Sequence, residues 1–237
     1  MHSSVLKTVM LAVCLMTNNA VAQTLALPEA LINFNSERGA RLLIQSKARA
    51  AYWPLSIQFV TQKNQVYCGV ATMVMVLNAL GVPAPATSEV ESFRFFTQEN
   101  VLNEHTEKIH PQSILNKKGM TLDQLGKILS TYGVKAQARH ATDSGLDEFR
   151  AIAIQHLETP SQHVIVNYLR SAIGQGDGGH ISPLAAYDAD TDRFLVLDVS
   201  RYKYPPVWVE AVEQYRAMNT VVQTLKIARE VTSSSNR

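Results

Sequence analysis

Cys68 is the residue of this sequence best suited by its setting to covalent chemistry. The chain has two cysteines, Cys14 and Cys68. Residues 69–80 are almost all apolar, and Gly81 and Pro83 follow them. This pattern predicts a buried helix with Cys68 at its first position. Free N–H groups at a helix N-terminus stabilise a thiolate and lower the thiol pKa from about 8.5 to roughly 3.5–7.5. Cys68 is therefore a candidate nucleophile, although a small core residue would suit the same position.

A nucleophilic thiol needs a base, and His180 is the histidine that the sequence places best for this role. It follows the glycine-rich turn at 174–179 and opens an apolar strand. Asp198 lies 18 residues further on, after the apolar run 194–197, where a carboxylate is expected only with a partner. If residues 188–192 form a hairpin turn, His180 and Asp198 become close to cross-strand neighbours. The pair then predicts a general base and the group that orients it.

Gln62 is a candidate donor for a developing oxyanion. It lies six residues before Cys68, on the polar stretch that leads into the predicted helix. Its side-chain amide could act together with the backbone N–H of Cys68, and one such donor typically contributes about 2.7–4 kcal/mol of transition-state stabilisation. A glutamine in a loop is more often simply solvated, so the residue alone does not decide between the two roles.

Other patterns that resemble ligand sites fail on their spacing. The run 174–179 lacks the Lys-Ser/Thr of a phosphate loop and precedes a strand. The aspartates at 188, 190 and 192 begin like a calcium loop, but Arg193 stands where glycine is required and Val199 where glutamate is required. The remaining histidines and the two cysteines show no metal-ligand spacing. We therefore predict no metal-binding residues and no bound cofactor.

The elements expected to position these residues change in type along the chain. Helices are predicted from Ser36 toward Ala50, from Cys68 to Leu80, from Leu122 to about Thr131 with a capping box at Thr121 and Gln124, and over residues 146–157. Residues 82–120 are expected to be rich in loops, with short helices near Phe93 and Ser113. Strands follow over residues 163–168, 181–187 and 193–199, then a helix over 209–218 and a strand over 221–227. This order predicts an α+β fold with a helical lobe followed by an antiparallel β-sheet lobe.

Composition and the N-terminal residues limit the class of protein and indicate its location. The 237 residues are 46% hydrophobic and 18% charged, which predicts one folded domain. A net charge of +2, spread along the chain, indicates no basic surface for binding nucleic acid.

Residues 1–22 have a basic start, a short apolar run and the ending Ala20-Val21-Ala22, as in a secretory signal peptide. The run is too short to span a bilayer, which needs about 20 apolar residues. We expect cleavage after Ala22, loss of Cys14, and a periplasmic or secreted domain over residues 23–237.

Three longer motifs give this sequence a resemblance to a known family. They are Tyr67-Cys68-Gly69-Val70-Ala71-Thr72 followed by residues 76–80, Gly179-His180-Ile181-Ser182-Pro183, and the run from Leu197 to Trp208. Together with Gln62 they resemble the phytochelatin synthase family, in its short prokaryotic form, within the papain-like cysteine peptidase superfamily. The likeness extends over about residues 50–230.

The resemblance implies a papain-like fold and a γ-glutamylcysteine dipeptidyl transpeptidase. Cys68 would attack the Cys–Gly bond of glutathione, and the γ-Glu-Cys acyl-enzyme would pass to a second glutathione or to water. His180 would be base and acid, Asp198 the orienting group, and Gln62 the oxyanion donor. Heavy-metal ions such as cadmium or zinc would enter as complexes with glutathione thiolates or act as activators. The assembly of two copies into a homodimer is left undecided.

The resemblance also implies residues that bind substrate. Arg201, Lys203 and Tyr204 fall in the motif associated with the second, acceptor substrate. Arg229 matches an arginine associated with the acylated glutamyl group, and a guanidinium suits an α-carboxylate. Val222 stands near the position where family members have an acidic residue, so the donor pocket is expected to differ there.

Two alternatives remain at this stage. One is a papain-like cysteine peptidase that acts on another peptide, and the other is a non-catalytic protein that binds glutathione or metal thiolates. A binding protein has no need for a nucleophile, a base and an orienting group together, so the sequence favours an enzyme.

Overall fold

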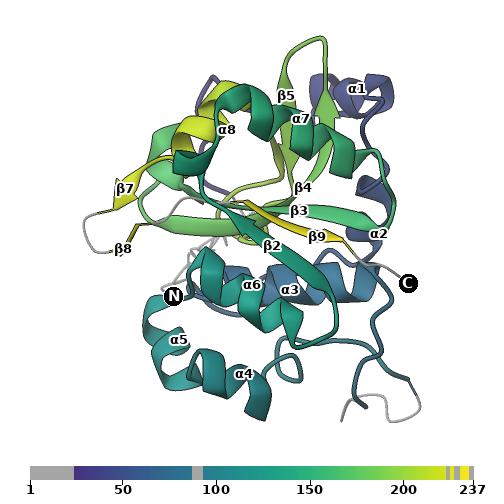
Figure 1. The fold of residues 1–237 in the computed structure, drawn as a ribbon. Helices are drawn as coiled ribbons and strands as arrows, with labels where there is room; N and C mark the ends of the chain where they lie inside the picture. The colour runs from purple at the N-terminus through teal and green to yellow at the C-terminus, as the bar shows by residue number, and fades with distance from the viewer. Residues whose placement is uncertain (1–23, 87–92, 223–224, 227–229, 235–237) are drawn as a thin grey trace, which may run out of the picture.

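The computed structural model describes residues 24–86, 93–222, 225–226 and 230–234, and it confirms the predicted α+β class (Figure 1). The helices are α1 (Glu37–Gln45), α2 (Tyr52–Ile57), α3 (Cys68–Ala79), α4 (Glu104–Ile109), α5 (Gln112–Lys118), α6 (Leu122–Ser130), α7 (Leu146–Leu157) and α8 (Ala211–Met218). The strands are β1 (Ile32–Asn33), β2 (Lys135–Arg139), β3 (Gln162–Leu169), β4 (Gly179–Asp188), β5 (Arg193–Val196), β6 (Val207–Glu210), β7 (Val221–Val222), β8 (Leu225–Lys226) and β9 (Glu230–Ser234). Two 3₁₀ turns, η1 (Ala141–Asp143) and η2 (Arg170–Ile173), complete the set.

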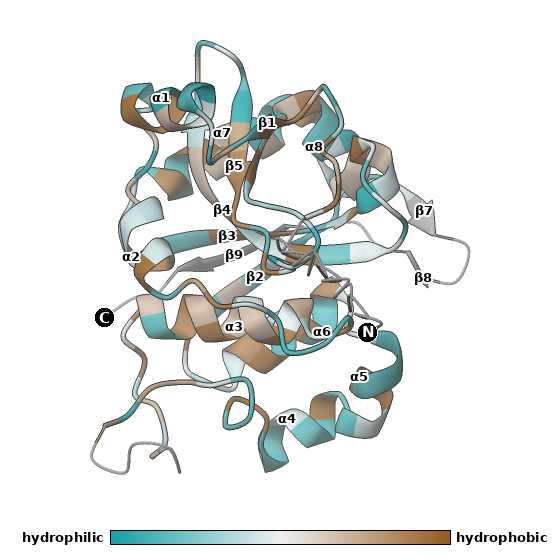
Figure 2. Ribbon diagram, turned by 180° about the vertical axis from the view of Figure 1, so that it is seen from behind, coloured by the Kyte–Doolittle hydropathy of each residue, from teal (hydrophilic) through white to brown (hydrophobic). Residues whose placement is uncertain are grey.

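One antiparallel sheet of seven strands separates two groups of helices. Its order is β1-β6-β5-β4-β3-β9-β2, and β7 and β8 form a separate hairpin. Helices α3 and α6 pack on the sheet from one side, with α4 and α5 beyond them, whereas α7 and α8 pack on the other side (Figure 1). Figure 2 shows the same arrangement from behind, where α4 is mostly hydrophilic in colour. The predicted helical lobe is therefore the layer from α3 to α6.

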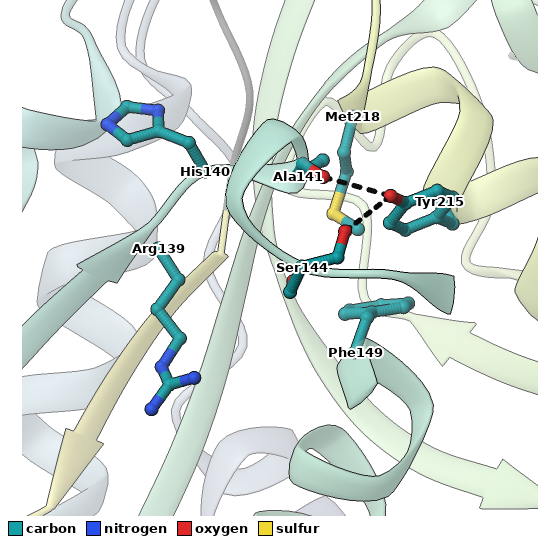
Figure 3. A pocket seen from close by; sticks show the side chains of 7 residues that line it. All are labelled: Arg139, His140, Ala141, Ser144, Phe149, Tyr215 and Met218. Atoms are coloured by element: carbon teal, nitrogen blue, oxygen red, sulfur yellow. Dashed lines mark hydrogen bonds between the residues drawn. The ribbon is translucent and has the colours of Figure 1, made fainter. Parts of the chain in front are cut away.

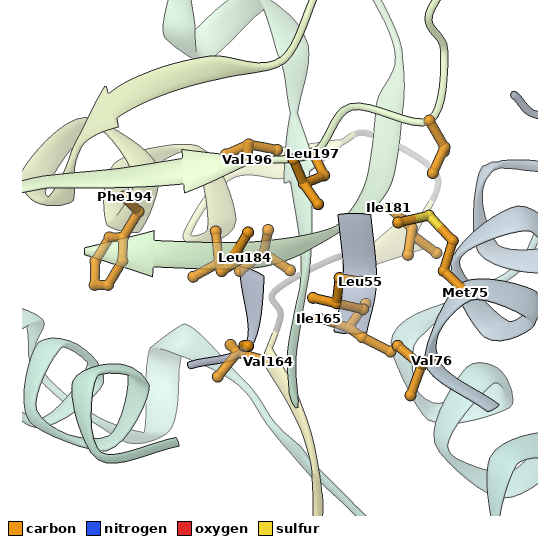
Figure 4. Packing of buried hydrophobic residues seen from close by; sticks show 14 of the residues in the cluster. Leu55, Met75, Val76, Val164, Ile165, Ile181, Leu184, Phe194, Val196 and Leu197 are labelled. Carbon is orange, nitrogen blue, oxygen red and sulfur yellow. The ribbon is translucent and has the colours of Figure 1, made fainter. Parts of the chain in front are cut away.

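The core lies on both faces of the central strands because successive side chains of a strand point to opposite faces. On one face, Ile165 and Ile181 lie among Leu55, Met75 and Val76 (Figure 4). Helix α3 is apolar nearly all round, and its residues from Cys68 to Leu77 are all buried. The expectation of a buried helix that begins at Cys68 is confirmed.

Local sequence signals set the helix boundaries. Ser36 caps α1 by accepting from the Gly39 N–H at 3.0 Å, and Thr121 and Gln124 form the predicted capping box of α6. Helix α7 has the predicted bounds. The described residues near Phe93 form no helix, because Arg94 forms an isolated antiparallel bridge with Ala86, and the part of this prediction before Phe93 lies outside the described residues.

His163 is a fully buried histidine of β3 whose ring nitrogens have no hydrogen-bond partner among the described residues. Burial lowers its pKa from 6.5 to about 4. The unfolded chain therefore takes up a proton as the pH falls through 6.5, and the folded chain does so only near pH 4. Stability should be unaffected above pH 6.5 and should fall by about 3 kcal/mol between pH 6.5 and 4 through this group.

Urea unfolding of His163→Leu and of the parent chain at several pH values measures this effect. We expect the free energy of unfolding of the parent to fall relative to that of His163→Leu as the pH drops from 7 to 4. His105 is exposed, so His105→Leu should leave the pH dependence of the parent unchanged. Parallel curves for the parent and His163→Leu would contradict the role of His163.

Candidate active site

The nucleophile candidate stands at the first position of α3, directly after the N-cap residue Tyr67. The residue is buried, with 8% of its surface exposed. The Tyr67 hydroxyl donates to Asn116 Oδ1 of α5 at 2.8 Å, and the Thr72 hydroxyl donates to the Ile181 carbonyl of β4 at 3.2 Å. These bonds fix the start of α3 against both the helical layer and the strand that carries His180.

A β-bulge in β4 brings Asp198 to the same side of the hairpin as His180. Near the turn, β4 and β5 pair in a register that, carried on unbroken, would place Asp198 opposite Pro183, on the other face from His180. The register shifts between Leu184 and Ala186. The shift moves Asp198 opposite Ser182, which lies two positions from His180 and on the same face of β4. The predicted hairpin is confirmed, and its bulge places Asp198 on the face of the hairpin that carries His180.

The ring of His180 is buried and held from several directions. Its Nε2 lies 2.8 Å from Asp198 Oδ1 and 2.9 Å from the hydroxyl of Ser182. Tyr168, the cross-strand partner of His180 in β3, packs edge-on against the imidazole with the ring centroids 5.7 Å apart. Since Nε2 is engaged by Asp198, Nδ1 is the nitrogen left for the hydrogen bond with the Cys68 thiol. This is the tautomer that a general base for Cys68 requires.

Asp198 is fully buried and accepts hydrogen bonds from three neighbours. Besides His180, Oδ1 accepts from the Ser200 backbone N–H at 2.8 Å. Arg170 donates to both carboxylate oxygens, from Nη1 to Oδ2 at 2.8 Å and from Nη2 to Oδ1 at 2.9 Å. The carboxylate thus lies between two cationic groups and has one fixed orientation.

These neighbours shift the proton affinities toward a thiolate and an imidazolium. Burial raises the pKa of Cys68, but the hydrogen bond and charge of His180 outweigh it and bring that pKa below its ordinary value. Burial lowers the pKa of His180, and Asp198 more than reverses this, so the net shift is upward. His180 and Arg170 together hold the pKa of Asp198 far below its usual range despite its burial. The arrangement supports nucleophilic attack by Cys68 and proton transfer by His180.

Gln62 is buried near the same segment. Its backbone N–H donates to the Val199 carbonyl at 2.9 Å, which ties it to the residue after Asp198. Its Nε2 donates to the Asn64 carbonyl at 2.6 Å and to the Tyr202 hydroxyl at 3.0 Å. Its buried Oε1 has no partner among the described residues. The amide is therefore not solvated, as an ordinary loop glutamine would be, and Tyr202 and Asn64 fix which way it faces.

The residues that the resemblance links to substrate binding lie in different surroundings. Arg201 is exposed, with its guanidinium 4.7 Å from the centre of the Phe59 ring. Lys203 is half-buried, and its carbonyl accepts from the Leu25 N–H at 2.7 Å. Tyr204 is buried, its hydroxyl accepts from the Gly176 N–H at 2.8 Å, and its ring lies beneath Arg170. Arg229 lies outside the described residues, as does the side chain of Val222.

A hollow of about 580 Å³ lies on the helical layer, within the usual size range of ligand pockets. Its lining includes His110, Lys118 and Met120. The Met120 thioether also lies against the backbone of Gly69, where a Cβ would come within 2.6 Å of its sulfur. The hollow and the start of α3 therefore share one side chain, and Gly69 has no room for a larger residue without movement of Met120.

A second pocket, between η1 and α8, has a structural role (Figure 3). Its volume of about 10 Å³ is enough for one water molecule at most. The Tyr215 hydroxyl donates to the carbonyl oxygens of Ala141 and Ser144, at 2.9 and 2.6 Å. These bonds fasten the loop before α7 to α8.

The described part of the chain holds no group of three or more His, Cys, Asp or Glu side chains that could bind a metal ion. Among the described residues, no helix has the length and apolar character needed to cross a membrane.

Sequence reasoning singled out Cys68, His180 and Asp198, which the structure brings together, but missed Arg170 and Tyr168. Arg170 follows the apolar strand β3 directly and is 4% exposed. A charged residue beside a buried strand is expected only with a partner, and that argument had already identified Asp198. Applied to Arg170, it would have predicted the pair. No sequence signal separates Tyr168 from an ordinary core tyrosine.

Comparison with known proteins agrees with the site. A family model described as phytochelatin synthase matches residues 22–229. Relatives include glutathione gamma-glutamylcysteinyltransferase 3 of Lotus japonicus, 32% identical over 84% of this chain, and glutathione gamma-glutamylcysteinyltransferase 1 of Arabidopsis thaliana, 30% identical over 81%. A glutathione gamma-glutamylcysteinyltransferase of Schizosaccharomyces pombe is 28% identical over 81%. The matches span 41%, 39% and 46% of the length of these relatives. On the extent of the family match, this chain belongs to the phytochelatin synthase family.

Proposed function

We propose that this protein is a glutathione γ-glutamylcysteinyltransferase that also hydrolyses glutathione. The observation that carries the proposal is the buried Cys68–His180–Asp198 arrangement, in a chain whose relatives are named for that transfer. The thiolate of Cys68 attacks the carbonyl carbon of the Cys–Gly bond, and His180 delivers a proton to the glycine nitrogen as it leaves. The thioester then reacts with the amine of a second glutathione, or with water, while His180 takes up the proton.

Heavy-metal ions enter this scheme as part of the substrate. Cadmium or zinc bound by two glutathione thiolates would be the acceptor, so the reaction itself needs no resident metal. Arg201 and Lys203 suit the carboxylates of such an acceptor, because both are cationic and neither is fully buried. A role in heavy-metal detoxification or thiol turnover follows from this substrate.

The direct test is an assay of glycine release. The purified full chain is incubated with glutathione, with and without Cd²⁺, and glycine and γ-Glu-Cys are quantified by mass spectrometry, with Cys68→Ala as the blank. Release above the blank supports the proposal, and the amount of (γ-Glu-Cys)₂-Gly then separates transfer from hydrolysis. Release equal to the blank, with cleavage of a longer peptide instead, would favour a peptidase with another substrate.

Gln62 should act as the oxyanion donor of this reaction. For this, Nε2 must exchange its bond to the Tyr202 hydroxyl for one to the oxyanion, because its other N–H is donated to the Asn64 carbonyl. We expect Gln62→Ala to lower kcat for glycine release by about 100- to 1000-fold with little change in KM, because the bond to the oxyanion forms only in the transition state. Gln98 provides the control, since it accepts from the Lys63 N–H and donates to the Thr61 carbonyl, on either side of Gln62. Gln98→Ala loosens the same loop and should keep kcat within a few-fold. Equal losses in the two variants would contradict the role of Gln62.

We also propose that the chain is exported and that residues 1–22 are removed as a signal peptide. The support is the basic, apolar and Ala-x-Ala order of those residues. N-terminal sequencing of the protein recovered from a secreting host should begin at Gln23. An intact N-terminus on protein retained in the cytoplasm would contradict export.

A further inference from the structure

Arg170 is a second cation inside the active site, and no step of the proposed reaction uses it. It is buried at the start of η2, immediately after β3. Its two Nη atoms contact the two oxygens of Asp198 at 2.8 and 2.9 Å, a two-point contact that a single ammonium group could not make. Arg170 therefore shares Oδ1 of Asp198 with His180, and it places on this carboxylate a second charge of the same sign as a protonated His180.

The guanidinium is itself held in place. Nη1 also donates to Gln175 Oε1, and the backbone N–H of Arg170 donates to the Gly178 carbonyl at 3.0 Å. The Tyr204 ring lies 5.2 Å from the guanidinium carbon, and the Tyr204 hydroxyl accepts from the Gly176 N–H. Contacts on several sides leave Arg170 one position, so it can impose an orientation on Asp198.

We propose that Arg170 is a positioning residue for the catalytic pair. Its two-point contact fixes the plane of the Asp198 carboxylate so that Oδ1 faces His180 Nε2, and its charge opposes the imidazolium form of His180. The effect of Arg170 on glycine release rests on the proposed function, whereas its effect on the Cys68 thiol does not.

The charge and the geometry of Arg170 make separable predictions. His180 is surrounded by Cys68, Asp198, Arg170 and the neutral Tyr168, and among these Arg170 lowers the pKa of His180. Arg170 and the Cys68 thiolate attract one another. Loss of the positive charge should therefore raise both the pKa at which the thiolate forms and the pKa at which the imidazolium loses its proton. A substitution that keeps the charge but loses the two-point contact should leave both pKa values unchanged and disturb only the orientation of the Asp198 carboxylate.

Two substitutions separate these effects. In Arg170→Gln the charge is lost, and both limbs of the pH profile for alkylation of Cys68 by iodoacetamide should move to higher pH by about one unit. In Arg170→Lys the charge remains, so both limbs should stay in place while glycine release falls about 100-fold. Alkylation is followed by mass spectrometry of the Cys68 peptide, so Cys14 does not contribute and no substrate is needed.

Arg150 supplies the matched control. It makes the same kind of two-point contact with Asp192, at 2.8 and 2.9 Å, and it also pairs with Asp147; neither carboxylate belongs to the active site. Arg150→Gln and Arg150→Lys should leave both the alkylation profile and glycine release unchanged.

The outcomes distinguish this inference from the proposed function. If Arg170→Gln folds and its alkylation profile keeps both limbs at the pH of the parent, the role of the charge is overturned. Glycine release at the parent rate by Arg170→Lys would overturn the role of the two-point contact with Asp198. If Arg170→Gln does not fold, Arg170→Lys tests the proposal alone: its glycine release should fall while its alkylation profile stays at the pH of the parent. Shifted limbs in a chain that releases no glycine would retain Arg170 as the positioning residue and reject the proposed substrate.

Discussion

Replacement of Cys68 by serine should reduce glycine release by about 10⁶-fold, the scale of the loss when a triad enzyme loses its nucleophile. Serine has nearly the shape of cysteine, so the buried first turn of α3 keeps its packing. The surroundings lower the pKa of the Cys68 thiol, but they cannot bring the pKa of an alcohol into the same range, so the serine hydroxyl stays protonated. The variant therefore keeps the fold and loses the thiolate.

The measurement is the initial rate of glycine release at saturating glutathione, with circular dichroism to check folding. Cys14→Ser is the matched control, since it removes the other thiol from a segment that is predicted to be cleaved. It should release glycine at the parent rate. A Cys68→Ser rate within tenfold of the parent would show that the nucleophile lies elsewhere.

The sequence predicted the buried helix that begins at Cys68 because the signals for it are local. The apolar run after Cys68, the capping box of Thr121 and Gln124, and the bounds of α7 each depend on residues a few positions apart. Such patterns determine the start and end of a helix before any tertiary contact forms.

Elements that depend on distant pairing were not predictable in this way. Strand β2 has the sequence Lys-Ala-Gln-Ala-Arg, which has no large apolar residue and favours a helix, yet it pairs along its whole length with β9, almost a hundred residues later. The bulge between Leu184 and Ala186 was not predicted either, although Pro183 directly before Leu184 is a possible signal, since proline within a strand is found mainly at edges and bulges. The pairing of His180 with Asp198 was thus predicted from an unbroken hairpin, while the register shift that aligns them was not.

Asp198→Ala should lower glycine release by about 10⁴-fold, as expected when the group that orients a catalytic histidine is lost. His180 Nε2 loses the acceptor at 2.8 Å that fixes its tautomer and supports its positive charge. The same substitution leaves Arg170 buried and without its carboxylate, and an uncompensated buried charge costs about 3–5 kcal/mol of folding free energy. A loss of activity in this variant alone therefore has two possible causes.

The double variant Asp198→Ala/Arg170→Met separates the two causes. Methionine fills part of the guanidinium volume without a charge, and apolar replacement of a buried ion pair is often neutral for stability. We expect urea unfolding to recover most of the lost free energy of unfolding, while glycine release stays about 10⁴-fold below the parent because His180 still lacks its orienting group. Recovery of glycine release together with stability would mean that Asp198 serves the fold alone. Recovery of stability without activity assigns to Asp198 the orientation of His180 and to Arg170 a charge that the fold tolerates only beside that carboxylate.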